Sequence, residues 1–542
     1  MTFGPFLLKD VRTVGDNLVL DLADANGVVK HSPKRKLRYS HSDDARMHAD
    51  RLVGSLVTTE TNDPIQWPAS HWWVSLAAFD QPQVDISRQT TKVFGPPGTG
   101  KTTTLINYVK EHVKLGVPTN KIAFLSFTNA AADVARQRVL EAFPEKTVMD
   151  FPNFSTLHSL ATRIGGLMNK NILDIEKLQQ FDPNVRNETV WMKKGDPSSA
   201  EDRPDYMPLA VQSFARARCI SMDEAIEQGN FESFNTVASN QMLLDFLSKR
   251  RGHQVAGTGL PLLKAYMLEY NTFKQRNNLA DFDDVIDNAQ QASFLPQIPS
   301  FDLLIIDEAQ DLSDLQWRLV QRLMGKAKRV IVAGDDDQAI MVPFGASPLA
   351  FLDLPGDTEI LPQSRRVPKA VHDYVEMHTL PLLVRAFPNR MEKTWLPVDF
   401  EGQIHTKVEK QKKETDPSGQ TQVVTVKSAI KLKDLLSIVK TSASEQWLIV
   451  APTKSTCRSI SAGLAQLKVP HYHRNQPILN PEQTASEVRV MSIHTSKGDE
   501  ADNVALVVLS IRDHEMLEND PRLRYVAQTR GRKALYPEVS GD

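Results

Sequence analysis

Residues suited to hold phosphate groups lie in one short stretch, which reads Gly95-Pro96-Pro97-Gly98-Thr99-Gly100-Lys101-Thr102-Thr103. It fits the pattern G-x-x-x-x-G-K-[ST]. The glycines let the backbone curl so that several N–H groups face one anion. Lys101 can reach the outer phosphates of a nucleotide, and the Thr102 hydroxyl can bind Mg²⁺. A glycine-rich turn that fits by chance is the alternative. The pattern predicts a nucleotide-binding loop.

A second set of chemical groups follows the apolar run Phe301 to Ile306, where the chain continues with Asp307 and Glu308. Asp307 is suited to hold Mg²⁺, usually through water, because that ion keeps much of its hydration shell. Glu308 is suited to orient and polarise an attacking water. The alternative is a buried strand followed by exposed acids. Downstream of a phosphate-binding loop, the pair predicts the hydrolytic half of the site.

Three further residues could act on the terminal phosphate. Gln338 follows the apolar run Arg329 to Gly334 and could sense that group. Arg366 and Arg530 lie in the second half of the chain, which has no loop of the G-x-x-x-x-G-K-[ST] type. A guanidinium that reaches across a cleft to a transferring phosphoryl group accelerates hydrolysis by about 10³ to 10⁵. The alternative is a pair of solvated surface arginines.

The elements that must position these groups alternate along the chain. Residues 91–94 are predicted to form a strand and residues 102–115 a helix, and similar pairs recur downstream. Such alternation predicts a doubly wound parallel sheet with ligands at the carboxyl ends of its strands. Polar residues that follow predicted strands are candidates for a second ligand; they are Thr128, Asn129, Thr156 and His158. A structural role is the alternative for the lone histidine.

The chain divides into parts of different composition. Residues 1–88 are predicted to form a small β-rich module. Residues 89–164 and 281–356 are predicted to form the first sheet domain, interrupted at 165–280 by a mostly helical insertion. Residues 357–542 are predicted to form a second α/β domain. Within it, Glu401 to about Val426 is expected to be a hairpin or loop.

The N-terminal module contains a predicted strand at Asn17–Leu22, a hairpin-type turn at Asn26-Gly27 and a basic run at residues 33–38. It also contains Trp67, Trp72 and Trp73. Basic residues near aromatic ones could form a nucleic-acid face. The plainer interpretation is a tryptophan-filled core with one solvated charge run.

Composition limits the class of protein. A length of 542 residues suggests about three or four domains. The net charge of −2 gives no overall basic signature, so a nucleic-acid surface must be local. Two distant cysteines predict no disulfide framework and a reducing compartment. No apolar run is long enough to span a bilayer, and the N-terminus lacks the features of a signal peptide. The expected location is cytoplasmic or nucleoid-associated.

Taken in order, the motifs resemble those of superfamily 1 helicases of the UvrD/Rep type, from about residue 91 to 537. The motifs that carry the resemblance are Gly95 to Thr102, Phe127-Thr128-Asn129, Thr156-Leu157-His158-Ser159, Asp281-Phe282-Asp283-Asp284, Asp307-Glu308-Ala309-Gln310, Gly334-Asp335-Asp336-Asp337-Gln338, Ile493-His494-Thr495-Ser496-Lys497-Gly498 and Tyr525-Val526-Ala527-Gln528-Thr529-Arg530. The resemblance implies two RecA-like P-loop motor domains with parallel sheets, which use ATP and Mg²⁺ to move on single-stranded DNA and at junctions with duplex.

The resemblance also implies roles for individual residues. Phosphate and Mg²⁺ would be bound by Lys101 and Thr102. Asp307 would hold the metal, Glu308 would activate water, and Glu500 would bond the ribose. The γ-phosphate would be contacted by Gln338, Arg366 and Arg530. The DNA path would be lined by Phe127, Thr128, Asn129, Thr156, His158, Phe344, His494 and Thr495.

Several positions depart from the family pattern. Arg365 stands where the family has a tyrosine that stacks on adenine, so contact with the base would be through a guanidinium. In the segment Met341–Phe344, only Phe344 could stack on a DNA base. Little room is left for the large 2B insertion of the second motor domain. The adenine-reading glutamine stays open among three candidates, Gln81, Gln83 and Gln89.

Four functions remain as alternatives. The first is a DNA-dependent ATPase and helicase with the family's usual 3′-to-5′ polarity. A superfamily 1 branch with the opposite polarity often shows the same Gly-Pro-Pro-Gly-Thr-Gly-Lys-Thr loop. A translocase that strips proteins from DNA is the third, and a non-enzymatic scaffold the fourth. A monomer is expected, and residues 1–88 could dock a replication or repair protein.

Overall fold

The computed structural model describes residues 2–14, 17–23, 29–31, 56–61, 74–78, 89–167, 171–183, 207–229, 237–291, 295–415, 421–473 and 487–541. Its centre is a six-stranded parallel sheet with the strand order β11-β6-β10-β9-β7-β8. The strands are β6 (Thr90–Phe94), β7 (Ile122–Ser126), β8 (Phe154–Thr156), β9 (Phe301–Ile306), β10 (Ala327–Gly334) and β11 (Asp357–Ile360). We call this sheet with its helices the first lobe.

The central strands of this sheet are buried on both faces, as expected for parallel strands covered by helices. All five residues of β7 are buried, and so are five of the six in β9. Polar residues at the strand ends cap the helices that follow. Thr128 caps α3 and Thr156 caps α4. The helices of the first lobe are α2 (Lys101–Lys114), α3 (Asn129–Leu140), α4 (Leu157–Ile164), α10 (Phe282–Gln290), α11 (Asp314–Met324) and α12 (Pro348–Leu352).

One predicted boundary is corrected. The second domain was expected to begin at residue 357, but β11 pairs in parallel with β6 of the first sheet. Its partners include Asp357 with Thr91 and Ile360 with Phe94. The first sheet therefore extends to Ile360. A short strand with exposed residues carries no sequence signal for the sheet that it joins.

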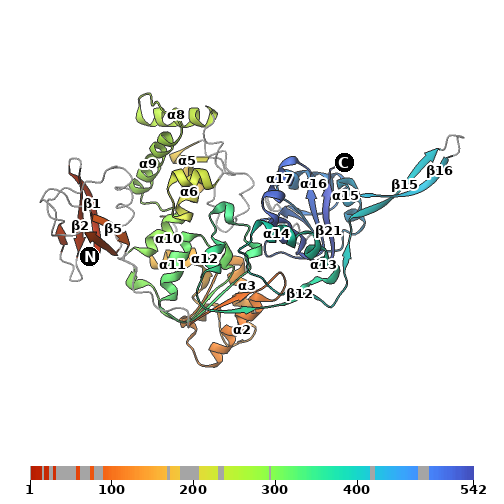
Figure 1. The fold of residues 1–542 in the computed structure, drawn as a ribbon, viewed down its shortest axis with the longest axis horizontal. Helices are drawn as coiled ribbons and strands as arrows, with labels where there is room; N and C mark the ends of the chain where they lie inside the picture. Colours follow the sequence, from red (N-terminus) through yellow and green to blue (C-terminus); the bar gives the residue numbers. More distant parts are fainter. Residues whose placement is uncertain are drawn as a thin grey trace.

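Between β8 and β9 the chain forms a helical unit with its own core, seen above the first sheet in Figure 1. Phe181 lies at its centre, with the rings of Phe246, Tyr266 and Tyr270 between 5.2 and 5.5 Å away. The helices are α5 (Ile175–Phe181), α6 (Met207–Arg218), α7 (Met222–Gln228), α8 (Val237–Arg251) and α9 (Leu260–Arg276).

The second lobe contains another parallel sheet of six strands, ordered β14-β21-β20-β17-β19-β18. Its strands are β14 (Gln403–Ile404), β17 (Trp447–Ala451), β18 (Tyr472–His473), β19 (Val488–Ser492), β20 (Ala501–Val508) and β21 (Gly531–Ser540). A two-stranded pair, β12 (Gln363–Pro368) and β13 (Leu396–Val398), leads into it. Its helices are α13 (Lys369–His378), α14 (Leu380–Ala386), α15 (Leu432–Thr441), α16 (Lys454–Gln466), α17 (Ile511–Asn519) and α18 (Pro521–Gln528).

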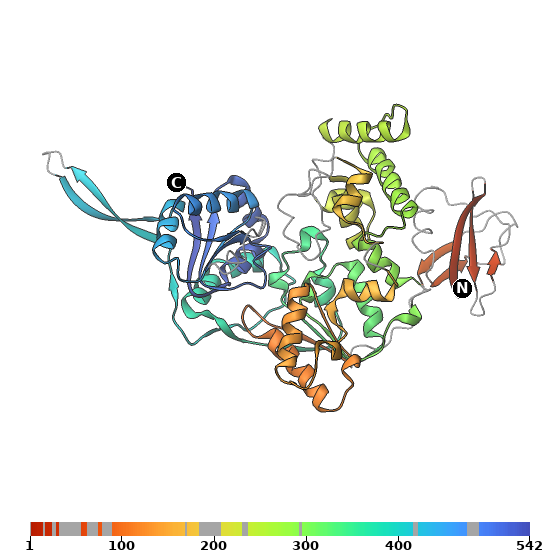
Figure 2. The same ribbon diagram turned by 180° about the vertical axis from the view of Figure 1, so that it is seen from behind.

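A hairpin of β15 (Lys407–Thr415) and β16 (Thr421–Ala429) projects away from the second lobe (Figures 1 and 2). The polar stretch from Glu401 to about Val426 was expected to be a hairpin or a loop, and the structure shows the hairpin, with its second strand continuing to Ala429. Its two strands pair with each other in a sheet of their own. The expected fold class, two parallel-sheet domains with a helical insertion, is confirmed.

The N-terminal part contains an antiparallel sheet ordered β3-β2-β1-β4-β5. Its strands are β1 (Thr2–Val14), β2 (Asn17–Ala23), β3 (Val29–His31), β4 (Leu56–Thr61) and β5 (Val74–Ala78). β2 confirms the predicted strand. The expected turn at Asn26-Gly27, the basic run at 33–38 and the three tryptophans lie outside the described residues.

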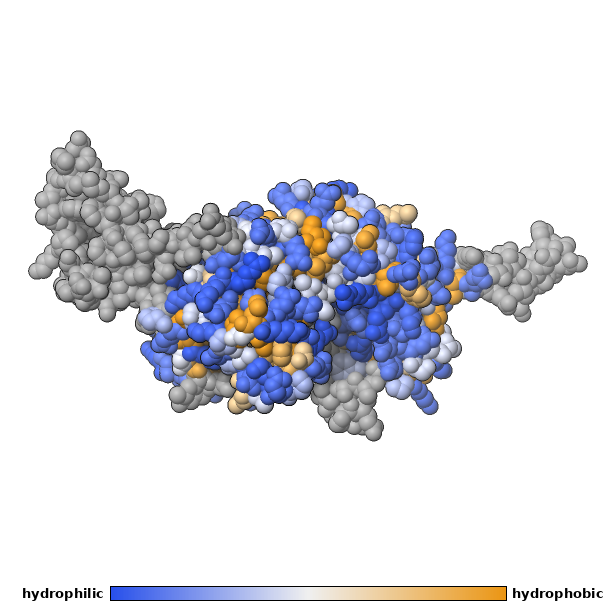
Figure 3. All heavy atoms as spheres, turned by 90° about the horizontal axis from the view of Figure 1, so that it is seen from below, coloured by the Kyte–Doolittle hydropathy of each residue, from blue (hydrophilic) through white to orange (hydrophobic). Residues whose placement is uncertain are grey.

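Among the described residues, no helix has the length and apolar character needed to cross a bilayer. The face seen in Figure 3 is mostly hydrophilic where the described side chains are drawn, and its apolar residues occur in small separate groups.

Candidate nucleotide site and nucleic-acid path

The phosphate-binding loop follows β6 and leads directly into α2, which begins at Lys101. Gly98 and Gly100 have φ angles of +76° and +83°, a conformation that favours glycine. A Cβ on Gly95 would lie 2.5 Å from Thr99 Oγ1 and 2.6 Å from Lys101 Cγ. Glycine is therefore needed here to leave the inside of the loop open. Backbone N–H groups and the positive end of α2 then suit this cradle to phosphate.

Two side chains of the loop donate hydrogen bonds to its own backbone carbonyl oxygens. Lys101 Nζ donates to the Gly95 carbonyl oxygen at 2.6 Å, and Thr99 Oγ1 donates to that of Pro96 at 2.9 Å. The ammonium thus lies across the loop, where it adds positive charge to the N–H groups. Thr102 and Thr103 follow in the first turn of α2, half-buried. These donors fit the triphosphate and magnesium predicted from the sequence.

Asp307 and Glu308 follow β9, the strand between β10 and β7. Burial and the neighbouring Glu308 raise the pKa of Asp307 to about 7, against the opposing effect of Lys101. A divalent cation would favour the anionic form of this carboxylate. The donor set of Asp307 with Thr102 fits Mg²⁺, which prefers oxygen ligands.

Glu308 has φ +56°, in the left-handed region that a non-glycine residue rarely adopts. Strain of this kind is held by the surrounding structure and is common at active sites. Burial acts to raise the pKa of Glu308, but Lys497 and Lys101 outweigh it and lower the pKa. Gln310 Nε2 donates to Glu308 Oε2 at 2.6 Å. The carboxylate is thereby held anionic and oriented, as a water-polarising base requires.

The second lobe contacts the phosphate-binding loop directly through β12. Ser364 Oγ donates to the Pro97 carbonyl oxygen at 3.0 Å, and the Arg365 N–H donates to that of Gly98 at 2.8 Å. A Cβ on Gly98 would lie 2.6 Å from Arg366 Cβ. Gly98 therefore serves both the left-handed turn and the contact between the lobes. Sequence patterns explained only the turn.

Arg530 and Arg366 both lie where the lobes meet. Arg530 Nη2 donates to Gln338 Oε1 at 2.6 Å, and its Nε donates to the Val526 carbonyl oxygen at 2.9 Å. Burial and the charge of Arg366 lower the pKa of Arg530 to about 10, so the side chain remains cationic at neutral pH. Arg366 Nη2 lies 2.5 Å from Glu500 Oε2. The structure thus brings Gln338 and Arg530 together, and pairs Arg366 with the residue expected to bond a ribose.

The next residues are those predicted to contact the ribose and the base of the nucleotide. Glu500 also lies 3.5 Å from Arg532 Nη1. Arg365 is exposed, with Nε 3.9 Å from where a Cβ on Gly100 would lie. Gln89 Nε2 donates to the Met324 carbonyl oxygen at 3.0 Å, so its amide is used within the first lobe. The other two glutamine candidates, Gln81 and Gln83, lie outside the described residues.

Lys497 belongs to the site, although no role for it was predicted from the sequence. Its Nζ donates to the Gln338 carbonyl oxygen at 3.0 Å, contacts Asp311 and lies 3.6 Å from Glu308 Oε2. This second-lobe cation thus meets the acids of the first lobe. Burial raises the pKa of Asp311 to about 6, against the effect of Lys497. Its place in the motif Ile493–Gly498 was the available signal.

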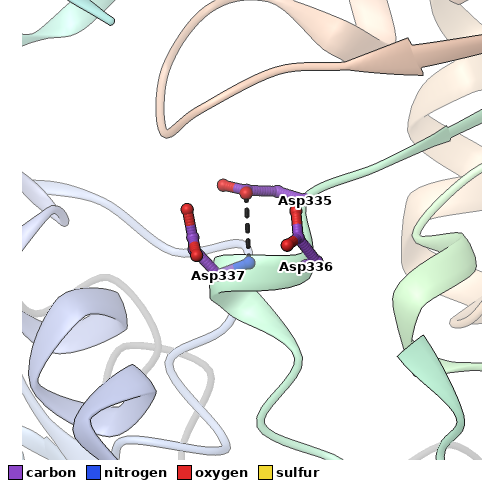
Figure 4. A group of neighbouring side chains, drawn as sticks. All are labelled: Asp335, Asp336 and Asp337. Carbon is purple, nitrogen blue, oxygen red and sulfur yellow. Dashed lines mark hydrogen bonds between the residues drawn. The ribbon is translucent and has the colours of Figure 1, made fainter. Parts of the chain in front are cut away.

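Asp335, Asp336 and Asp337 follow β10, and Figure 4 shows them around one turn of chain. Their candidate ligand atoms lie within 4.8 Å of one another, which is close enough to hold one metal ion. The Lys393 ammonium contacts all three, at 2.7, 2.5 and 2.8 Å. This cluster is therefore already paired with a cation of the protein.

Four residues predicted to line the DNA path lie at the starts of α3 and α4, after the neighbouring strands β7 and β8. The Thr128 and Thr156 hydroxyls cap these helices, and Asn129 is exposed. The His158 ring lies edge-on to Phe282, with centroids 5.5 Å apart. Burial lowers the pKa of His158 to about 4, so the ring is neutral at pH 7.

The other four belong to both lobes. Phe127 and Phe344, from the first lobe, pack against the core of the second. The Phe344 ring lies edge-on to His494, with centroids 6.0 Å apart. His494 and Thr495 are 4% and 7% exposed, and Ser492 Oγ donates to Thr495 Oγ1 at 3.0 Å. The eight predicted residues therefore form two groups, one on the first lobe and one at the lobe interface.

Comparison with known proteins gives two matching family models. The model described as the UvrD/REP helicase N-terminal domain matches residues 78–358. The model described as the viral superfamily 1 RNA helicase core domain matches residues 269–536. The first match covers the phosphate-binding loop, the helical insertion and the Asp307-Glu308 pair, and the second covers both lobes of the site downstream of the insertion.

Individual relatives are more distant. ATP-dependent DNA helicase Rep of Escherichia coli is 26% identical over 270 residues, which are 47% of this chain and 35% of that protein. ATP-dependent DNA helicase PcrA of Leuconostoc citreum is 27% identical over 276 residues, 46% of this chain and 32% of that protein. ATP-dependent DNA helicase srs2 of Schizosaccharomyces pombe is 25% identical over 277 residues, which are 47% of this chain and 28% of that protein. The matches to these three span only about a third of each relative.

Proposed function

Because the chain belongs to the UvrD/Rep helicase family, we propose that it is an ATP-driven motor that moves on single-stranded DNA and separates strands at junctions with duplex. The observation that carries the proposal is the meeting of Arg530 with Gln338. A second-lobe guanidinium there reaches the first-lobe residue best placed to sense a γ-phosphate. This contact supports hydrolysis at the lobe interface.

The proposed chemistry uses groups of both lobes. The loop N–H groups and Lys101 bind the phosphates, and Glu308 orients and polarises the attacking water. Mg²⁺, held by Thr102 and Asp307, would neutralise phosphate charge when bound. Arg530 and Arg366 exchange their present partners for the terminal phosphate and stabilise its charge during transfer.

Movement then follows from the contacts between the lobes. Binding of ATP adds bonds from both lobes to one phosphate group, and hydrolysis removes them. Because the closed and open states differ in these contacts, each turnover biases the lobe arrangement. Phe127, Phe344 and His494 lie where the lobes meet, so a shift there would change the grip on DNA bases. Stacking on bases is worth about 1 to 3 kcal/mol each without sequence preference.

The central experiment measures ATP turnover with and without single-stranded DNA. DNA-stimulated turnover is expected for the natural chain, and Lys101→Ala is expected to abolish it because the phosphates lose their cation. Lys114→Ala, which alters an exposed lysine on the same helix, is the matched control and should turn over normally. Unchanged turnover in Lys101→Ala would sink the site assignment.

Polarity is proposed as 3′ to 5′, from the Gly334–Gln338 and Asp281–Asp284 motifs. Duplexes with a 3′ or a 5′ single-stranded tail test it, because a motor of this polarity opens only the 3′-tailed substrate. Opening of the 5′-tailed substrate alone would reverse the proposal.

A protein-stripping translocase is the second candidate. One feature favours it: only residues 452–493 lie between β17 and His494, the interval in which the large insertion of the family would lie. Movement along single strands without opening of either tailed duplex would select this function. Residues 1–88 would then be the first place to look for a protein partner, and a monomer is proposed in both cases.

A further inference from the structure

A lysine outside every motif of the family resemblance lies at the junction of the lobes. Lys393 has a side chain only 1% exposed, and its ammonium contacts Asp335, Asp336 and Asp337. A lysine is almost never buried this completely unless its charge is paired. Burial acts to lower its pKa, but the three carboxylates outweigh this effect and raise it. The side chain is therefore a fixed cation.

Lys393 belongs to the second lobe, whereas the carboxylates belong to the first. It lies between α14 and β13, two residues before Trp395. Trp395 is buried in the second-lobe core, where its ring lies 5.9 Å from that of Tyr525. The lysine thus lies two residues from a packed side chain of the second-lobe core, which contacts the helix that precedes Arg530.

One of the three carboxylates leads directly to the candidate γ-phosphate sensor. Asp335 Oδ1 lies 2.7 Å from Lys393 Nζ, and Asp335 Oδ2 accepts from Gln338 Nε2 at 2.7 Å. Gln338 Oε1 in turn accepts from Arg530 Nη2 at 2.6 Å. A carboxylate only accepts and a guanidinium only donates, so these two partners fix which end of the amide faces which lobe.

A branch of the same network reaches the water-polarising acid. The Asp335 N–H donates to Gln310 Oε1 at 3.0 Å, and Gln310 Nε2 donates to Glu308 Oε2 at 2.6 Å. Asp335 is fully buried, so its carboxylate needs a charged partner to remain anionic at this position. Lys393 provides that partner. Removing one member of a buried pair leaves the other uncompensated.

We propose that Lys393 is a positioning residue for ATP hydrolysis: through Asp335 it orients the Gln338 amide, and it thereby couples the arrangement of the second lobe to γ-phosphate sensing. This inference rests on the proposed function. A lysine that only docks the two lobes would account for the contacts with Asp336 and Asp337. It would not account for the directed chain from Asp335 through Gln338 to Arg530.

The neighbouring Arg390 provides a matched control. It comes from the same segment and pairs through Nε and Nη2 with both oxygens of Asp337, with Nε at 2.7 Å. The Asp335 carboxylate accepts from Lys393, from Gln338 and from the Asp337 N–H, and Arg390 is not among its donors. Replacement of Arg390 therefore removes an equal charge from the same junction and leaves the chain to Gln338 in place.

The test compares Lys393→Met, Lys393→Arg and Arg390→Met in the full chain. DNA-stimulated ATP turnover gives kcat and KM, and a fluorescent ADP analogue gives the Kd for diphosphate. For Lys393→Met we expect kcat to fall at least about tenfold, while KM for ATP and the Kd for ADP change less than about threefold, because the phosphate-binding loop is untouched. Lys393→Arg should restore most of kcat, and Arg390→Met should retain it within about threefold.

Lys393→Met combined with Asp336→Asn is included in case the single variant does not fold, since it removes one cation and one anion together. It should fold and still show the low kcat. The inference is overturned if Lys393→Met, or this double variant, turns over like the natural chain. It is also overturned if Arg390→Met loses kcat equally. A natural chain without ATP turnover would instead overturn the proposed function, and the inference with it.

Discussion

Glu308 shows how much one residue of this site depends on its surroundings. It stands in a left-handed conformation, its pKa is lowered by Lys497 and Lys101 against the effect of burial, and Gln310 holds one of its oxygens. The lowered pKa and the held oxygen are suited to a base that must remain anionic. The two lysines that lower the pKa are far from Glu308 in the chain.

The prediction at this position concerns Glu308→Gln, which keeps the shape and the bond from Gln310 but removes the basic oxygen. ATP turnover should fall by about 10² to 10⁴, the usual contribution of a positioned general base. Nucleotide binding should persist within a few-fold, measured with a fluorescent ADP analogue. Glu111→Gln, on an exposed position of α2, is the control and should behave like the natural chain. A Glu308→Gln variant with normal turnover would assign the water to another group.

His158 predicts a pH dependence of stability. Its pKa in the folded chain is about 4, against an ordinary value of 6.5, because burial disfavours the charged ring. Between these values the unfolded chain binds a proton here that the folded chain does not. The contribution of His158 to the free energy of unfolding should therefore fall as pH falls from about 6.5 to about 4, by up to about 3 kcal/mol, and should then level off.

Urea unfolding at a series of pH values measures the effect. His158→Gln should remove the His158 contribution from the pH dependence across this window, whereas His514→Gln, at an exposed position of α17, should leave the dependence as in the natural chain. Equal slopes for His158→Gln and the natural chain would show that the ring is accessible to protons in the folded state.

At the scale of elements, the β15–β16 hairpin is the clearest independent unit. Its strands pair only with each other in the described sheets, and both views show it extending from the second lobe (Figures 1 and 2). Near the base of the hairpin, Glu409 of β15 lies opposite Lys427 of β16 in the strand register. Val408 packs against the second-lobe core. The far part of the hairpin is thus separable from the fold.

Replacing residues 410–426 by Asn-Gly should close the hairpin at the Glu409–Lys427 pair with a two-residue turn. The melting temperature should stay within about 2 °C, because no core contact near Val408 is lost. Differential scanning fluorimetry and ATP turnover without DNA are the measurements. Val408→Ala, which removes a contact with the core, should lower the melting temperature more than the deletion does. The opposite order would show that the far part of the hairpin carries stability.

At the scale of the whole molecule, the N-terminal sheet and the first-lobe sheet share no strand among the described residues. Figure 1 places the N-terminal sheet and the hairpin at opposite ends of the molecule, with the nucleotide site between them. The proposed nucleotide site therefore does not depend on strand pairing with the described strands of residues 1–88.

Removal of residues 1–88 is expected to leave the phosphate-binding loop folded. Circular dichroism should show the helix content of the remaining chain, and the Kd for a fluorescent ADP analogue should match that of the full chain within a few-fold. Lys101→Ala in the shortened chain controls for specific binding. A folded truncation that fails to bind nucleotide would show that the N-terminal sheet completes the site.

The sequence by itself determined the motifs on which the proposed chemistry depends and the order of the elements. Gly95 to Thr102, Asp307-Glu308 and the motifs around Gln338 and Arg530 are local patterns, because a turn, a cap or a strand end constrains residues that are close in the chain. Strand and helix periodicity likewise predicted two parallel-sheet units and a helical insertion. Sequence patterns are sufficient for these features, since each depends on neighbours within a few residues.

Only the tertiary structure decided which distant segments of the chain contact one another. The half-exposed strand β11 joins the first sheet, Ser364 donates to the Pro97 carbonyl oxygen of the phosphate-binding loop, and Lys393 contacts three first-lobe carboxylates. None of these residues has a local signal for its partner, because a buried charge is stable only when residues far apart in sequence bring the opposite charge to it. Burial and pairing are properties of the folded chain, so these contacts between the lobes could not be predicted from sequence patterns.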